Sequence, residues 1–208
     1  GLHETGAQKT GIISAYPGKE TRFPTSPHTA IYNGPHITVG SACFKSLDNP
    51  YSNNNLCTKV DLTVIPDNYL PKVQYEPTNY EEYLRTLDKV SWDKVTPAIN
   101  FYRIALRSRV GSDSERTLTS GIMSRFINHI NKVETLAFHF VDVLPAIAGY
   151  LASLPVDFYV RQQNKSDILA DLIRKIPLPQ FGIYEDLIKT RSLCLNCLTT
   201  YHEDLWNC

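Results

Sequence analysis

The sequence predicts a mixed α/β fold of the α+β kind, with a sheet-rich lobe over residues 1–141 and a helical lobe over residues 142–208. Two observations predict it. Residues 1–80 hold eight of the 13 prolines and six of the 10 glycines, which is typical of short strands joined by long loops. Near Asp142 the hydrophobic period changes from two residues to between three and four. The 208 residues are enough for one domain, so both lobes are expected to form a single domain with a mixed or antiparallel sheet.

The first half is expected to contain short strands and one short helix. Strands are predicted at His36–Val39 and Thr58–Ile65, where β-branched residues are frequent. An apolar stripe at helical spacing predicts a helix within residues 81–95, which ends before Pro97. Turns are predicted at residues 17–18, 33–35 and 48–50.

The middle of the chain is expected to form strands. A polar, glycine-led loop, Gly111–Thr117, separates the first two of them. Side chains alternate between the faces of a strand, so Arg103 and Arg107 are expected on one face and Ile104 and Leu106 on the other. The predicted strands are Ile99–Arg107, Leu118–Met123 and Thr135–Val141.

From Asp142 onward the pattern is helical. Asp142 is predicted to be the N-cap of a helix whose apolar stripe extends to Leu154, and Pro145 is tolerated in its first turn. A short helix is predicted at Ser166–Lys175. A last helix is predicted at Ile183–Trp206, with a stripe long enough to pack against the other helices or against a missing neighbouring domain.

Charge is balanced overall but uneven along the chain. Lys+Arg and Asp+Glu are both 21, so the formal net charge is zero. Between Arg103 and Lys132, however, six basic residues stand against only Asp113 and Glu115. Arginine suits phosphates and guanine edges, so this stretch predicts DNA contact. The alternative is a solvated sheet face beside an exposed loop.

Catalytic motifs are mostly absent. The sequence contains no dinucleotide-binding glycine motif, phosphate loop, nucleophile elbow or His-Glu-x-x-His string. Asp48-Asn-Pro-Tyr51 partly matches the Asn-Pro-Pro-Tyr loop of amino-group methyltransferases, but it has one proline and no hydrophobic strand before it. We interpret it as a turn. A standalone hydrolase is disfavoured, because no nucleophile–base spacing occurs, and the chain itself is expected to be non-catalytic.

The five cysteines favour a cytoplasmic protein without a metal site. An odd number argues against a secreted disulfide scaffold. Cys194 and Cys197 have ligand spacing, but zinc would have to borrow Cys43 and Cys57, which are too loosely spaced. We therefore interpret the thiols as packed on a helix face. No run reaches the ~20 apolar residues that a bilayer span requires, so no membrane association is expected.

Four segments match sequence blocks of one enzyme family. Phe101–Met123 is similar to a block in which spaced arginines precede Glu-Arg-Thr and an apolar strand. Ile147–Arg161 looks like a helix ending in Asp-aromatic-x-x-Arg. Ser166–Pro179 matches an ending shared with type I specificity subunits, and Arg191–Trp206 is similar to a further helix. On these segments the chain resembles large prokaryotic adenine-specific DNA methyltransferases, including type IIG restriction–modification enzymes and phage-defence methylases, and the matches cover about residues 60–208 in the family's order.

The resemblance implies a target-recognition domain that lies C-terminal to a catalytic domain. Its fold is then similar to that of type I specificity-subunit recognition domains, and its partners are double-stranded DNA and the missing methyltransferase domain. S-adenosylmethionine belongs to the parent, and no cofactor is expected in this chain. The start at Gly1 and the single Met123 agree with a piece of a longer protein.

Twelve residues are candidates for DNA contact. Glu115 can accept from a cytosine amino group and Arg116 can pair with guanine, although an ion pair that pins the loop to the sheet is an open alternative for both. Arg103 and Arg107 are expected to hold phosphates or to support the loop. The candidates are Arg103, Arg107, Arg109, Ser112, Ser114, Glu115, Arg116, Thr117, Arg125, Asn128, His129 and Lys132. The competing function is a protein-interaction module whose helical lobe docks on a partner.

Overall fold

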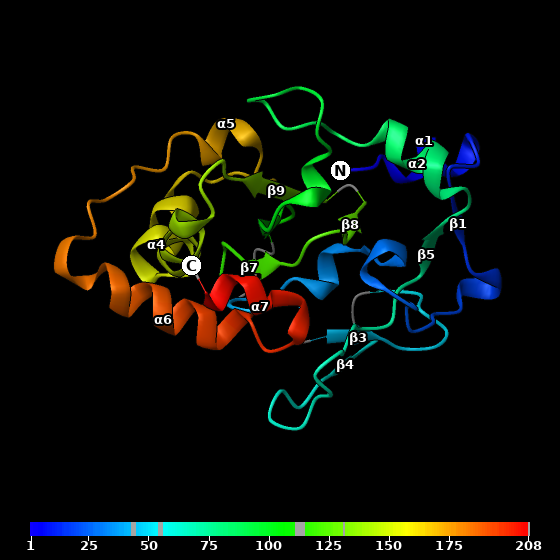
Figure 1. Ribbon diagram of the computed structural model, residues 1–208, viewed down its shortest axis with the longest axis horizontal. Coiled ribbons are helices and arrows are strands. Elements are labelled where there is room, and N and C mark those ends of the chain that lie inside the picture. Colours follow the sequence, from blue (N-terminus) through cyan, green and yellow to red (C-terminus); the bar gives the residue numbers. More distant parts are fainter. Residues whose placement is uncertain (43–44, 54–55, 111–114, 131, 208) are drawn as a thin grey trace.

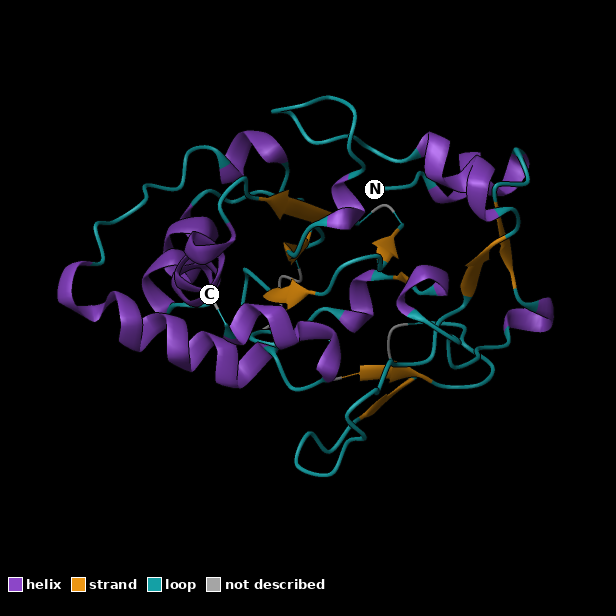
Figure 2. Cartoon of the chain, viewed as in Figure 1, coloured by secondary structure: helices purple, strands orange, loops and turns teal. Residues whose placement is uncertain are grey.

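Short strands and turns of the N-terminal half meet a group of helices formed by the C-terminal half (Figure 1). The computed structural model describes residues 1–208 apart from residues 43–44, 54–55, 111–114, 131 and 208. The strands of the described residues form three sheets (Figure 2). The predicted mixture of sheets and helices is therefore confirmed.

The N-terminal sheet draws one strand from the second half of the chain. In spatial order its strands are β1 (Ile13–Ala15), β5 (Tyr75–Pro77), β2 (Ile31–Tyr32) and β8 (Asn128–His129). β8 pairs in parallel with β2, whereas the other pairs are antiparallel. Ala7 of α1 (Glu4–Lys9) and Tyr83 of α2 (Tyr80–Thr86) pack with Ile31 in one apolar cluster. A separate hairpin contains β3 (Lys45–Leu47) and β4 (Cys57–Lys59).

The central sheet is covered on both faces. It is antiparallel, and its strands in spatial order are β7 (Ser120–Met123), β6 (Arg103–Arg107) and β9 (Val133–Ala137). Ile104 and Leu106 face the helices, and Ala105 faces an N-terminal cluster that contains Tyr32 and Ile37. The predicted alternation along β6 is confirmed. The face that carries Arg103 and Arg107 is not a solvated one, because the N-terminal half packs against it.

The helices pack on the other face of the central sheet. They are α3 (Leu144–Leu151), α4 (Leu154–Gln162), α5 (Ala170–Ile173), α6 (Glu185–Asn196) and α7 (Glu203–Trp206). Leu144, Val156 and Leu172 share a cluster with Ile104. α3 and α6 approach closely at Gly149, where a Cβ atom would lie 2.8 Å from Cγ2 of Ile188.

Short 3-10 turns connect these elements. Two of them precede predicted elements and shift their starts. β6 begins at Arg103 rather than at residue 99, because residues 98–100 form such a turn. The turns are Pro17–Lys19, Pro27–Thr29, Gly34–His36, Ala98–Asn100, Val141–Val143, Gly182–Tyr184 and Thr200–His202.

The strand predicted at His36–Val39 is wrong. Residues 34–36 form a 3-10 turn, in which the N–H of Asn33 donates to Nδ1 of buried His36 at 2.9 Å. Thr38 and Ser41 then close a further turn. Local side-chain hydrogen bonds of this kind compete with extended backbone.

The strand predicted at Thr58–Ile65 is too long. β4 ends at Lys59, and residues 61–64 form a turn closed by the N–H of Val64 donating to the carbonyl of Asp61. Oδ1 of Asp61 accepts from the N–H of Thr63 at 3.0 Å and from its hydroxyl at 2.6 Å. An aspartate that bonds backbone two residues on favours a turn over a strand. The predicted turn at residues 48–50 is confirmed, with a bend at residues 49–50.

The predicted helix boundaries need correction. Asp142 lies in a 3-10 turn, and Val143 is the N-cap of α3. Pro145 lies in the first turn, as predicted. The stripe toward Leu154 breaks before α4, because Pro155 lacks the N–H that a continuous helix would need.

The other predicted helices are shorter than expected. α2 ends at residue 86 because the next residue, Leu87, has an extended backbone conformation. Within residues 166–175 only the four residues of α5 are α-helical. The last helix is interrupted after α6 because the Asn196 carboxamide oxygen accepts from the N–H of Ile122 at 2.7 Å, and Cys197 leaves the helical conformation. A contact with a distant strand thus ends α6.

No single helix within the described residues is long and apolar enough to cross a membrane. One bent pair, residues 141–151 with residues 154–162, meets the length and composition requirement together, with a 68° bend between its halves. Leu144, Leu151, Val156 and Val160 of this pair lie in the apolar cluster beneath the central sheet.

Candidate functional site

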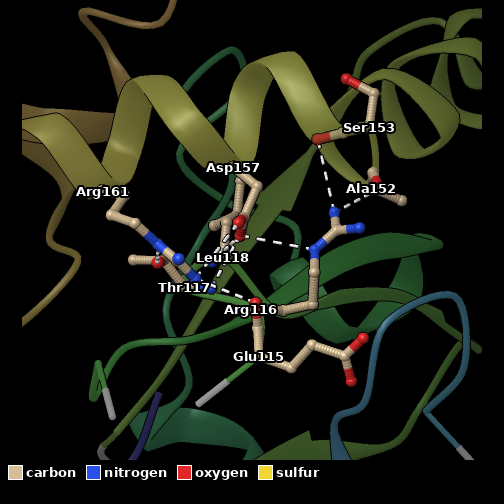
Figure 3. A network of polar contacts seen from close by, with 8 residues as sticks. All are labelled: Glu115, Arg116, Thr117, Leu118, Ala152, Ser153, Asp157 and Arg161. Carbon is tan, nitrogen blue, oxygen red and sulfur yellow. Dashed lines mark hydrogen bonds and ion pairs between the residues drawn. The ribbon is translucent and has the colours of Figure 1, made fainter. Parts of the chain in front are cut away.

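The segment that carries the Glu-Arg-Thr string is held by the carboxylate of Asp157 (Figure 3). Asp157 lies in the first turn of α4 and is buried. Its Oδ1 accepts from the backbone N–H groups of Thr117 and Leu118, both at 2.7 Å. Arg116 and Arg161 approach the same carboxylate at 3.5 and 3.8 Å. Two backbone donors and two cations thus converge on one buried anion, which fixes the start of the strand to the helix.

The two arginines of this network also bind backbone carbonyls. Nη2 of Arg116 donates to the carbonyls of Ala152 and Ser153, at 2.6 and 3.3 Å, at the junction of α3 and α4. Nη2 of Arg161 donates to the carbonyl of Glu115 at 2.9 Å. A guanidinium at a helix C-terminus satisfies carbonyls that have no partner within the helix. Both side chains therefore stabilise the fold.

The contacts of Arg116 favour the anchoring alternative, with the helical half and not the sheet as the anchor. Thr117 is buried, and its hydroxyl accepts from Nε of Arg161 at 2.8 Å. The exposed side chain of Glu115 points away from Asp157 (Figure 3). The remaining candidates of this loop, Ser112 and Ser114, lie outside the described residues.

Three further candidates are buried beneath the surface. Arg103 is 2 % exposed, Asn128 3 % and His129 1 %. Arg103 lies on the middle strand of the central sheet, on the face that the N-terminal half covers, and β8 places Asn128 and His129 in the N-terminal sheet. In this conformation none of the three can reach a duplex. We therefore correct their predicted role from DNA contact to support of the interior.

Arg125 lies half-exposed on the C-terminal side. Its Nη1 pairs with the carboxylate of Asp204 at 2.8 Å, and its guanidinium lies 4.6 Å from the centroid of the Tyr102 ring. The contact with Asp204 connects the segment after β7 to the end of the chain, and the contact with Tyr102 connects it to the residue before β6. Arg125 is thus separate from the other exposed candidates.

The remaining three candidates, Arg107, Arg109 and Lys132, meet at one cavity of about 350 Å³. Lys19 of the N-terminal half adds a fourth cation to its wall. Arg109, Lys132 and Lys19 are exposed, and Arg107 is half-buried. The wall is formed by Glu4, Lys19, Asn33, Gly34, Pro35, Tyr51, Ser52, Gln74, Tyr75, Arg107, Arg109, Ile130 and Lys132. We call this the basic cavity.

Backbone pairing holds these cations in place. The N–H of Ser108 donates to the carbonyl of Lys132 at 2.9 Å, which brings Lys132 beside the end of β6. Arg109 pairs with Asp167 through an isolated backbone bridge. Gly34 faces the same place, since a Cβ atom there would lie 3.7 Å from Cγ of Arg107.

Carboxylates near the basic cavity leave an excess of positive charge. Glu4 accepts a hydrogen bond from the hydroxyl of Tyr75. Lys132 pairs with Asp167 at 3.4 Å. Within the described part of the chain, Arg107 and Arg109 form no ion pair with a carboxylate. The cavity can therefore attract an anion.

Lys19 and Tyr51 were not predicted from the sequence. Both come from the N-terminal half, and the N–H of Tyr51 donates to the carbonyl of Lys19 at 2.9 Å. Burial raises the pKa of the Tyr51 hydroxyl above its ordinary value, so the ring is neutral at physiological pH. Residues more than 50 positions away from β6 leave no signal in the local pattern that identified the arginines.

The described residues give less support to metal binding and to a methyltransferase loop. Among the described residues no group of three or more histidine, cysteine, aspartate or glutamate side chains could hold a metal ion. Cys194 is exposed on α6, and Cys197 is buried just after that helix. The side chain of Asn49, in the string that partly matches the methyltransferase loop, bonds to the backbone and side chain of Thr21. The Asn49 side chain therefore stabilises the turn.

No family model, curated protein or solved structure matches this chain. Its function is therefore argued from the basic cavity and from the charge and motif pattern of the sequence.

Proposed function

We propose that this chain is the sequence-specific DNA-recognition module of a prokaryotic adenine-specific DNA methyltransferase that acts in restriction–modification or phage defence. Methyl transfer from S-adenosylmethionine then belongs to a catalytic domain outside this chain. The observation that carries the proposal is the basic cavity, where Arg107, Arg109, Lys132 and Lys19 meet. Neutralising phosphates with such cations supplies the sequence-independent part of DNA affinity.

The roles divide according to accessibility. Arg107 and Arg109 present guanidinium forks that can bind a phosphate or a guanine edge, and Lys132 and Lys19 act as point charges. Glu115 is exposed and has an acceptor suited to a cytosine amino group. The buried candidates stabilise the interior that supports these exposed side chains.

The alternative of a protein-interaction module also has an observation in its favour. Large apolar side chains are exposed on the helical half, among them Ile183 at 90 %, Leu154 at 70 % and Phe158 at 64 %. Exposed apolar groups that together form one contiguous patch are typical of contact surfaces. A recognition domain that docks on a catalytic domain would need such a surface as well, so the two functions are compatible.

Salt-dependent DNA binding tests the proposal. We expect the chain to bind duplex DNA with an affinity whose logarithm falls linearly with the logarithm of salt concentration. Replacing Arg107, Arg109 and Lys132 by alanine should weaken binding and reduce that slope by about one for each phosphate contact that is lost. Fluorescence anisotropy of a labelled duplex from low to physiological salt measures both quantities.

A control triple variant removes the same charge elsewhere. Lys9, Arg174 and Lys175 are exposed and do not line the basic cavity. Their replacement by alanine should leave the slope nearly unchanged. Equal losses in the two triple variants would show only a non-specific charge effect, and the absence of duplex binding would refute DNA recognition by this chain.

A further inference from the structure

Arg103 is a buried cation in the middle of the fold. Its Nη2 donates to the carbonyl of Ile127, whereas its Nε is buried and has no hydrogen-bond partner in the described structure. Burial lowers the pKa of Arg103 to about 10, so the guanidinium is still protonated at neutral pH. An uncompensated buried charge is costly, which is why such charges are ordinarily paired.

The carboxylates of the described residues do not compensate this charge. None of them lies within ion-pair distance of Arg103. The nearest candidate on the wall of the adjoining void, Asp88, is paired with the amino group of Gly1 at 2.6 Å, and its side chain is 72 % exposed. The interior thus holds a positive charge that no described carboxylate neutralises.

Another buried donor group lies beside the guanidinium. The side chains of Asn128 and Tyr83 are buried and interact with each other, and Asn128 also lines the void next to Arg103. The ring nitrogens of His129 are used by Ile130 and Thr135. A buried cation beside an amide NH₂ group, which has two donor hydrogens, favours an anion and disfavours a metal ion.

A void of about 30 Å³ lies at this place. Its wall includes Arg103, Asn128, His129 and Thr135, together with apolar Leu87 and Ile99. A site needs only ~10–15 Å³ of such space to hold one water molecule, so a water or a small monatomic ion fits in this void.

We propose that this void binds one small monatomic anion, chloride under cellular conditions, held by Arg103 and Asn128. The ion neutralises the buried guanidinium and satisfies a donor of β8 at the same time. It thereby ties the central sheet to the N-terminal sheet. This site is separate from the basic cavity and does not depend on the proposed DNA recognition.

Chloride dependence of folding tests the site. Unfolding by urea is measured in potassium chloride and in potassium gluconate mixed at constant ionic strength, because gluconate is too large for the void. A ligand that binds only the folded state should raise the folding equilibrium constant tenfold for each tenfold rise in chloride above its dissociation constant. Identical stability in the two salts would overturn the proposal and leave only a water in the void.

A single substitution can supply the missing negative charge. Asn128→Asp places a carboxylate beside Arg103 with almost no change in side-chain volume. We expect this variant to lose the chloride dependence and, in gluconate, to be at least as stable as the wild type is in gluconate. Asn207→Asp, at an exposed position near the chain end, is the matched control and should keep the full chloride dependence. Chloride dependence that survives in Asn128→Asp would place the ion elsewhere.

Crystals of the wild-type chain grown in sodium bromide give a direct readout. An anomalous difference peak is expected in the void between Arg103 and Asn128, and it should vanish in Asn128→Asp. The absence of a peak there in the wild type would refute the site, whatever the salt series shows.

Discussion

Two pairs of arginines lie in opposite surroundings. Arg116 and Arg161 share the buried carboxylate of Asp157 and donate to backbone carbonyls. Arg107 and Arg109 lie at the end of β6 on the basic cavity, and neither forms an ion pair with a carboxylate of the described residues. The first pair is bound to a buried carboxylate and to backbone carbonyls, and the second pair faces space that a ligand can enter.

This difference teaches that the partners of an arginine, and not its position in a basic run, indicate its role. Arg116 and Arg107 belong to the same excess of basic residues between positions 103 and 132. Arg116 contacts the helical half, and its removal affects that contact. Arg107 contacts a cavity, and its removal should affect binding while leaving the fold intact.

Removing the shared carboxylate should have the largest effect. Asp157→Ala leaves two buried backbone N–H groups and the cations Arg116 and Arg161 without their acceptor. Breaking a buried pair in this way costs about 3–5 kcal/mol of the free energy of unfolding. Urea denaturation measures it. Arg107→Ala is the matched control and should change stability by less than about 0.5 kcal/mol. A small effect of Asp157→Ala would mean that the network does not hold the fold.

Acidification should lower the stability of the fold through His36, which lies in a turn at the wall of the basic cavity. The 3-10 turn at this wall ends at His36, whose Nδ1 accepts from the N–H of Asn33 and whose Nε2 donates to the carbonyl of Lys72, both at 2.9 Å. Burial lowers the pKa of His36 to about 4, against 6.5 in the unfolded chain. The unfolded state therefore binds the proton first, and stability is lost as the pH falls from about 6.5 toward about 4.

The size of this loss follows from the shift. Between pH 7 and pH 5 His36 should lower the free energy of unfolding by about 2 kcal/mol. Urea denaturation at several pH values measures the free energy of unfolding. Between pH 7 and pH 5 this free energy should fall by about 2 kcal/mol less in His36→Gln than in the wild type. His139→Gln, at an exposed position, should leave the pH dependence unchanged. Equal pH dependence in the wild type and His36→Gln would show that His36 is not held neutral by the turn.

The sequence predicted the parts of the fold that depend on local patterns. Alternation along residues 102–107 correctly assigned the two faces of β6, because one period of two residues suffices for that assignment. It did not predict that the N-terminal half covers the face of Arg103, because that contact joins residues far apart in the sequence. For the same reason Lys19 and Tyr51 were missed at the cavity.

The loop that carries Glu115 illustrates the other limit. The sequence correctly left two roles open for Arg116, because one guanidinium can pair with a base or with a carboxylate. Its partner Asp157 lies 41 positions further along the chain, and no local pattern connects the two. Contacts between neighbouring residues could therefore be predicted from the sequence, whereas contacts between residues far apart in the sequence could be found only in the structure.

The smallest expected effect, exchange of arginine for lysine, separates the two pairs most sharply. In Arg116→Lys a single ammonium cannot reach Asp157 and the carbonyls of Ala152 and Ser153 together, so the variant should lose about 1 kcal/mol of stability. Arg107→Lys keeps its charge, so both its stability and the salt slope of DNA binding should stay within error. Only its preference among target sequences should weaken, because lysine lacks the fork that matches guanine. Urea denaturation and competition between duplexes measure these quantities. A loss of stability in Arg107→Lys but not in Arg116→Lys would reverse the assignment of the two pairs.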